Sequence, residues 1–288
     1  MATNTASAAS GGLGASRDAL SWLTGDNSLA VPMLPDLAQR VIAMSSDPDI
    51  AITRLSAMVA KDQVLASRVL GLANSAHSAP MQTISTVHDA IVRLGTAAVR
   101  NVVVTVSLTS KMQDPAVYGA RGRELFDHAL GTAYMARVVA ERTRVNADEA
   151  FLYGLMHDIG KLVILKLAHE HQRKTGRMVP PDVVAQALEE RHAVMGAVAL
   201  RRWHLPESVD DPVMFHHNYP AAPRHQREAA VCYLANRLSH RYGFGCDVDA
   251  GEVGSDEVLE VLDLDGGWLA ATDARAPGLF AIARQALG

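Results

Sequence analysis

The sequence predicts an all-α protein whose helices form two lobes. Almost every apolar segment repeats at the three- and four-residue spacing of an amphipathic helix. The one β-branched run, Val102–Val106, could form a strand, but it lies within a long succession of helical segments, which favours a helix. Proline and glycine punctuate Asp114–Gly122, and this segment is a natural boundary between the two lobes.

We therefore expect a disordered N-terminus (1–18), an N-terminal helical lobe (19–113) and a second helical lobe (114–242). A helical tail is expected to follow, at 243–288. With 49% apolar and 20% charged side chains among its 288 residues, the chain has an ordinary globular composition.

The N-terminal lobe is expected to contain helices at Pro35–Met44, Ile52–Ala60, Gln63–Ala73, Val87–Leu94 and Ala97–Met112. Asp62 is a suitable N-cap for the third of these, because its side chain can accept the first free backbone N–H groups. Gly95 separates the last two.

The second lobe is expected to contain helices at Glu124–Thr143, Ala147–Ala168, Pro181–Trp203, Glu207–His217 and Gln226–Tyr242. Pro181 suits a first helical turn, where proline loses no hydrogen bond. Two short helices are expected in the tail, at Asp256–Leu262 and Gly278–Leu287.

Composition argues against several classes of protein. A net charge of −4 and a pI near 6.3 give no support for a nucleic-acid partner. The two cysteines have no paired spacing, which excludes a disulfide scaffold and suits a reducing cytoplasm. No segment reaches the roughly 18 consecutive apolar residues of a membrane span, and Met1–Ser16 lacks the basic start and apolar core of a signal peptide. We expect a cytoplasmic protein with no membrane partner.

The most informative motif is His157-Asp158-Ile159-Gly160-Lys161, within the otherwise apolar run 151–165. An adjacent imidazole and carboxylate are costly to bury without compensation. A divalent metal is the usual compensation, because neutral His and ionised Asp are ligands for Zn, Fe and Mn.

Further histidines occur in similar helical contexts, giving the ordered series His128, His157-Asp158, His192 and His216-His217. Any one of them has an ordinary explanation as a hydrogen-bonded residue, but the whole series indicates descent from a metal site. A hydrogen-bonded polar core with water is the alternative for the whole group.

This series resembles the HD superfamily of metal-dependent phosphohydrolases, and the chain as a whole resembles the HDOD domain, an HD-related output domain of bacterial signalling proteins. The resemblance spans roughly 31–242 and is strongest in an N-terminal block that plain HD enzymes lack. The motifs of this block are Leu34-Pro35-x-Leu37, Lys61-Asp62-Gln63-x-Leu65, Arg68 to Ala76 and Ile84 to Gly95. A later segment, Gly196 to Pro206 with Trp203-x-Leu205-Pro206, also resembles the HDOD domain.

Similarity to the HD-GYP phosphodiesterases implies a role for each site residue. The implied metal ligands are His128, His157, Asp158, His192, His216 and His217. Asp158 would bridge two metals and Lys161 would contact a substrate phosphate. Those enzymes have a final Asp where this chain has Asn236, and an amide brings no charge to the site. The Gly-Tyr-Pro loop of the phosphodiesterases is also missing after His217.

We therefore expect a bacterial signal-transduction output module that is not catalytic and retains a partial site for one divalent metal (Fe, Mn or Zn). Its expected partners are an unidentified signalling protein and a nucleotide ligand. The alternative is a metal-dependent phosphohydrolase acting on a nucleotide or cyclic dinucleotide, with Asp158 and Lys161 as the catalytic residues.

Overall fold

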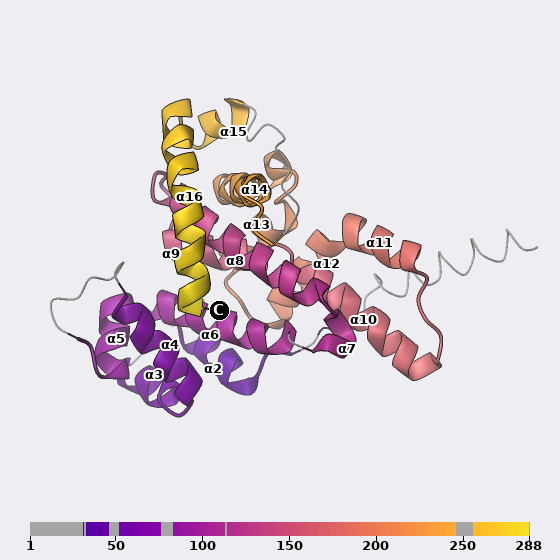
Figure 1. Ribbon diagram of the computed structural model, residues 1–288, viewed down its shortest axis with the longest axis horizontal. Coiled ribbons are helices and arrows are strands. Elements are labelled where there is room, and N and C mark those ends of the chain that lie inside the picture. Colours follow the sequence, from indigo (N-terminus) through magenta and orange to yellow (C-terminus); the bar gives the residue numbers. More distant parts are fainter. Residues whose placement is uncertain are drawn as a thin grey trace, which may run out of the picture.

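The computed structural model describes residues 31, 33–45, 52–75, 83–112, 114–245 and 256–287 (Figure 1). Within these residues the protein is helical and contains no β-strand, so the predicted fold class is confirmed. The expected disordered segment 1–18 lies outside the described residues.

The N-terminal helices pack on one another and form the lower left of Figure 1. They are α2 (Asp36–Ser45), α3 (Ile52–Val59), α4 (Gln63–Ala73), α5 (Val87–Leu94) and α6 (Thr96–Met112). Asp62 caps α4 as predicted, since its Oδ1 accepts from the N–H groups of Val64 and Leu65 at 2.9 and 3.1 Å. Val102, Val103 and Val104 are buried in α6, so packing on several sides overrides the strand preference of β-branched residues.

The remaining helices make up the larger part of the molecule. They are α7 (Pro115–Tyr118), α8 (Arg121–Ala140), α9 (Ala147–Met156), α10 (Ile159–Thr175), α11 (Pro181–Glu190), α12 (His192–Arg202), α13 (Asp210–Met214), α14 (Gln226–Arg241), α15 (Asp256–Val261) and α16 (Gly266–Leu287). Helix α8 packs between α9 and α14, α10 packs on α12, and α13 packs on α12 and α14. Two 3₁₀ turns, Glu207–Val209 and Tyr219–Ala221, flank α13.

Two expected helices are each broken into two. The expected helix Ala147–Ala168 is interrupted at His157 and Asp158, and α10 then continues to Thr175. The expected helix Pro181–Trp203 is interrupted at Arg191. Neighbouring residues of a continuous helix point about 100° apart. A break is therefore what lets His157 and Asp158 face one site.

Helix α13 ends at Met214, so His216 and His217 lie in the turn that follows it rather than in the expected helix Glu207–His217. Helix α8 begins at Arg121 rather than Glu124, which places His128 in its interior and not at its start.

The C-terminal helix α16 is longer than the expected Gly278–Leu287. It begins at Gly266, where Oδ1 of Asp265 accepts from the N–H of Trp268 at 2.7 Å. This Asp cap lets the helix begin at the Gly266-Gly267 pair. Helix α16 packs on α8 and also contacts α4 and α6. The Arg241 guanidinium pairs with Asp273 at 3.0 Å and joins α14 to α16.

No single helix among the described residues is both long and apolar enough to cross a membrane. Helices α5 and α6 would pass by length and composition only if taken together, and they are bent by 112° where they meet.

Candidate metal centre

His157 and Asp158 occupy the junction where α9 ends and α10 begins. His157 is the C-cap residue of α9, and Asp158 precedes the first residue of α10. His157 is fully buried and Asp158 is 5% exposed. An ionised carboxylate at this depth needs strong local compensation.

Three of the histidine rings are held in the same way. In His157, His192 and His216, Nδ1 faces the backbone carbonyl of the residue three positions earlier. The distances are 2.8 Å to Gly154, 3.2 Å to Glu189 and 2.6 Å to Val213. A carbonyl only accepts, so Nδ1 carries the proton and Nε2 presents a lone pair.

On one side of Asp158, Oδ2 faces the first pair of rings. It lies 3.4 Å from Nε2 of His157 and 3.8 Å from Nε2 of His128. The two Nε2 atoms are 3.3 Å apart. His128 comes from the interior of α8, and its Nδ1 donates to the carbonyl of Phe244 at 3.2 Å.

On the other side, Oδ1 of Asp158 faces a group of three rings. It lies 3.4 Å from Nε2 of His192 and 3.8 Å from Nε2 of His216. Nε2 of His192 is 3.2 Å from Nε2 of His216 and 3.0 Å from Nε2 of His217. The structure thus brings together all six ligand candidates that the sequence singled out, as two groups joined by one carboxylate.

The arrangement fits a metal better than a hydrogen-bonded polar core. With Nδ1 protonated, the Nε2 atoms of His157, His192 and His216 cannot donate to Asp158. Among the described residues, the buried Oδ1 of Asp158 accordingly has no hydrogen-bond partner. Two ligands bound to one cation at about 2.1 Å lie roughly 3.0–3.4 Å apart. The Nε2 separations of 3.0–3.3 Å fall in this range.

The protein holds the rings in the neutral form that ligation requires. Burial, reinforced by His157, lowers the pKa of His128 to about 3. Burial and the neighbouring His192 lower the pKa of His217 to about 4. Burial also lowers the pKa of His192 and of His216.

Asp158 stays ionised despite its depth. Burial acts to raise the pKa of its carboxyl, but the charge of the Lys161 ammonium acts in the opposite direction and helps to hold the pKa well below the ordinary value. Lys161 Nζ lies 2.6 Å from Oδ2 of Asp158. It sits one turn into α10 and is partly exposed.

Asn236 of α14 completes the buried wall of the site. Its Oδ1 lies 3.0 Å from Nε2 of His128. Nε2 of His128 and Oδ1 of Asn236 are both acceptors, and at this distance they could share a cation. If the Asn236 amide were flipped, its NH₂ group would instead donate to Nε2 of His128 and occupy the lone pair. A carboxylate here would have added a second negative charge.

A pocket of about 380 Å³ opens beside the histidines, and we call it the metal-side pocket. It is lined by Arg121, Leu125, Lys161, Leu165, Ala185, Leu188, Glu189, His192 and His217. Sequence reasoning missed Arg121. The i, i+4, i+7 spacing of Arg121, Leu125 and His128 places all three on one face of α8, but the helix was expected to begin after Arg121.

Two close backbone approaches position the ligand candidates. A Cβ on Gly160 would collide with the carbonyl oxygen of His192, so this glycine lets α10 lie directly against the start of α12. A Cβ on Gly131 would lie 2.5 Å from Cβ of Phe244. Gly131 thus lets the Phe244 segment lie against α8, where its carbonyl orients His128.

The ring of His240 lies 4.7 Å from the ring of His128. It therefore packs against a ligand candidate. The sequence signal for this contact is the i, i+4 spacing of Asn236 and His240, which places both side chains on one face of α14.

A helical fold that surrounds a buried His-Asp centre in this way defines an HD-type protein. The family profile of the HDOD domain matches residues 31–219, so the chain belongs to the HDOD domain family. The family match confirms the resemblance inferred from the N-terminal block and the ordered histidines.

Solved structures share the fold. An HDOD domain protein of unknown function from Geobacter sulfurreducens is 24% identical, with a TM-score of 0.68 over 95% of this chain and 97% of that one. A protein from Shewanella amazonensis SB2B, provisionally described as a metal-dependent phosphohydrolase, is 16% identical, with a TM-score of 0.69 over 96% and 100% of the two chains.

The similarity to curated relatives covers only part of each relative. An uncharacterized protein of Treponema pallidum is 27% identical over 201 residues, which is 67% of this chain and 39% of that protein. Ribonuclease Y of Thermosipho melanesiensis is 31% identical over 120 residues, or 41% of this chain and 19% of the enzyme. The chain thus spans well under half the length of these relatives.

Proposed function

We propose that this protein is a signalling module that holds one divalent metal around Asp158 and binds a phosphate-containing ligand in the metal-side pocket without hydrolysing it. The observation that carries the proposal is the set of inward-facing Nε2 lone pairs around one buried, ionised carboxylate. Membership of the HDOD domain family, which the resemblance described above links to bacterial signalling, supports the signalling role.

Charge supports one metal rather than two. Histidine ligands bring no negative charge, so within the described residues Asp158 contributes the single negative charge of the cluster. Lys161 adds a positive charge 2.6 Å from that carboxylate. Two divalent ions would leave a large uncompensated charge in a buried site. Histidine nitrogens with one carboxylate suit Zn, Fe or Mn.

The residues of the pocket suit an anionic ligand. When bound, the metal would supply positive charge for a phosphate oxygen. Lys161 and Arg121 line the same space and would donate to the remaining phosphate oxygens. Leu125, Leu165 and Leu188 offer an apolar wall for the rest of the ligand. A nucleotide has this combination of charged and flat apolar parts.

Asn236 is the reason to propose binding without hydrolysis. It gives the His128 side of the centre an amide where a carboxylate would help to retain a second cation. Two-metal centres clamp both the attacking and the leaving oxygen of a phosphate ester. A site with one well-held cation lacks half of that clamp.

Hydrolysis is the second candidate, favoured by the pocket that opens directly at His192 and His217. The Shewanella amazonensis protein is described as a metal-dependent phosphohydrolase, and ribonuclease Y takes its name from RNA cleavage. An RNA substrate has less support here, because the net charge of this chain is −4.

The test begins with metal analysis by plasma mass spectrometry on protein purified without chelator or His tag. Near-stoichiometric Zn, Fe or Mn is expected. Calorimetry with adenosine monophosphate should then show binding that falls by roughly tenfold in Lys161→Met, while Lys174→Met, an exposed lysine of the same helix, changes nothing.

Turnover separates the two candidates. Incubation of the metal-loaded protein with bis(p-nitrophenyl) phosphate and with cyclic dinucleotides should give no product. Metal-dependent turnover would establish the hydrolase instead. Metal-free, well-folded protein that does not bind added metal would overturn both.

A further inference from the structure

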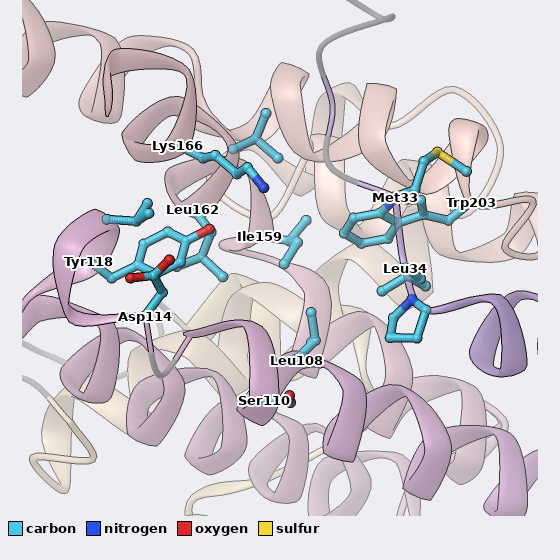
Figure 2. A pocket seen from close by; sticks show the side chains of 13 residues that line it. Met33, Leu34, Leu108, Ser110, Asp114, Tyr118, Ile159, Leu162, Lys166 and Trp203 are labelled. Atoms are coloured by element: carbon cyan, nitrogen blue, oxygen red, sulfur yellow. The ribbon is translucent and has the colours of Figure 1, made fainter. Parts of the chain in front are cut away.

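A second pocket, which we call the seam pocket, lies where the N-terminal helices meet α7, α10 and the end of α12 (Figure 2). It holds about 360 Å³. Ligand pockets begin at about 300 Å³, so this space suits one small molecule. Leu34, just before α2, and Leu108 of α6 line it on one side, and Ile159, Leu162 and Trp203 line it from the other side.

The seam pocket has an apolar end. Leu34, Leu108, Ile159 and Trp203 are each no more than 4% exposed, and Figure 2 shows them gathered around one part of the space. Met33 lies above Trp203 in that view and is 40% exposed, so it is an accessible apolar side chain of the lining. This end would bury the apolar body of a ligand.

The opposite end carries both signs of charge. Figure 2 shows the ammonium of Lys166 and the hydroxyl of Tyr118 pointing into the same space, with the Asp114 carboxylate beside the Tyr118 ring. Burial, with Asp114 adding to it, raises the pKa of Tyr118 to about 12, so its hydroxyl remains a donor. In the part of the chain that the structure describes, one long ion pair, 4.0 Å to Glu170, competes for the charge of Lys166.

We propose that the seam pocket binds a free α-amino acid with an apolar side chain. Its carboxylate would accept from Lys166 and Tyr118, its ammonium would pair with Asp114, and its side chain would enter the apolar end. One cation and one anion in the lining leave no net charge, so a zwitterionic head complements them better than a simple acid or amine.

Such a ligand would act on the helix that carries the metal centre. Ile159 directly follows Asp158, and it lines the seam pocket together with Leu162, Val163 and Lys166 of α10. Lys161 of the same helix lines the metal-side pocket. Helix α10 thus joins the two pockets, although binding in the seam does not itself require a metal.

Isothermal calorimetry on the full chain with L-phenylalanine, L-leucine and L-tryptophan tests the proposal. At least one should bind. Three truncated probes separate the parts of the ligand: glycine lacks the apolar body, 3-phenylpropionate lacks the ammonium and 2-phenylethylamine lacks the carboxylate. Each should bind at least roughly tenfold more weakly than the best amino acid.

Two variants locate the site. Tyr118→Phe removes only a hydroxyl and Lys166→Met removes only a charge, so both keep the apolar packing, and each should weaken binding by about tenfold. Lys174→Met, at the exposed end of α10, should bind as the unaltered protein does.

Absence of binding by all three amino acids would overturn the proposal. So would equal or tighter binding of 3-phenylpropionate or 2-phenylethylamine, or affinity unchanged in both variants. Metal content is measured separately, so failure here leaves the proposal for the metal centre standing, and the reverse also holds.

Discussion

Nε2 of His128 and Nε2 of His157 lie 3.3 Å apart in the interior, with the Nδ1 of each ring turned to a backbone carbonyl. Both Nε2 atoms therefore present lone pairs to the same small space. Facing lone pairs repel unless a cation lies between them, so the pair is arranged for ligation rather than for mutual hydrogen bonding.

Replacing the central carboxylate should remove the metal without unfolding the protein. Asp158→Asn keeps the shape but removes the charge that both groups of histidines face. We expect metal affinity to fall by at least roughly tenfold, measured by plasma mass spectrometry after dialysis against a fixed free metal concentration. Asp182→Asn, at an exposed acid of α11, is the control. Equal metal content in both variants would contradict the assignment.

Introducing an acid at position 236 should strengthen metal binding at the centre. Asn236→Asp places a carboxylate oxygen close to His128, where the amide oxygen now lies 3.0 Å away. The added charge should raise the metal content above that of the unaltered protein, up to a second equivalent. Gln226→Glu makes the same chemical change at an exposed position of the same helix and should leave the content unchanged.

Should Asn236→Asp bind no more metal than the Gln226→Glu control, the amide would not be what limits the site. Hydrolysis of bis(p-nitrophenyl) phosphate that appears only in Asn236→Asp would show that the amide also accounts for inactivity.

The close approach of α10 and α12 predicts a steric effect. In Gly160→Ala the new methyl group would meet the carbonyl of His192, and backbone cannot move aside cheaply. We expect a loss of about 1–3 kcal/mol in the free energy of unfolding, measured by urea denaturation. Gly71→Ala is the matched control, because its Cβ would meet nothing within 4 Å and a helical alanine is favoured. Equal stability of the two variants would contradict the packing.

The metal-free protein should lose stability as the pH falls below about 6.5. His128, His192 and His216 have pKa values lowered by burial in the folded protein, whereas unfolding restores the ordinary value of about 6.5. Between the two values the unfolded chain binds more protons, so acid favours unfolding. At pH 5.5 the ring of His128, whose pKa is lowered to about 3, should cost roughly 1 kcal/mol.

Urea denaturation in the presence of a chelator, at pH 7.5, 6.5 and 5.5, measures this effect. In His216→Gln the free energy of unfolding should change less steeply with pH, because this variant has one titrating ring fewer. A free energy of unfolding that is constant across the three pH values would contradict the burial of neutral rings.

Much of the site was predictable because its residues keep a fixed order along the chain. The series His128, His157-Asp158, His192 and His216-His217 indicated one site, and the structure brings these residues together. The positions of the helix ends were less predictable. Apolar periodicity continues through His157 and Asp158, so the sequence pattern alone does not show the break there.

The residues that the sequence missed depend on contacts between distant segments. Arg121 lines the metal-side pocket because α8 begins earlier than its pattern indicated. Phe244 orients His128 through a backbone carbonyl, which leaves no trace in side-chain type. The seam pocket likewise exists only where Leu34, Lys166 and Trp203 converge from three parts of the chain.

The sequence by itself determined the helical class, the HDOD family and the identity of the ligand candidates, because periodicity and ordered motifs are local properties. Tertiary structure decided which nitrogen of each ring faces inward and where the two pockets open. It also left Oδ1 of Asp158 without a hydrogen-bond donor among the described residues. These depend on helix breaks and on packing between segments far apart in sequence, where one glycine or one carbonyl sets the geometry.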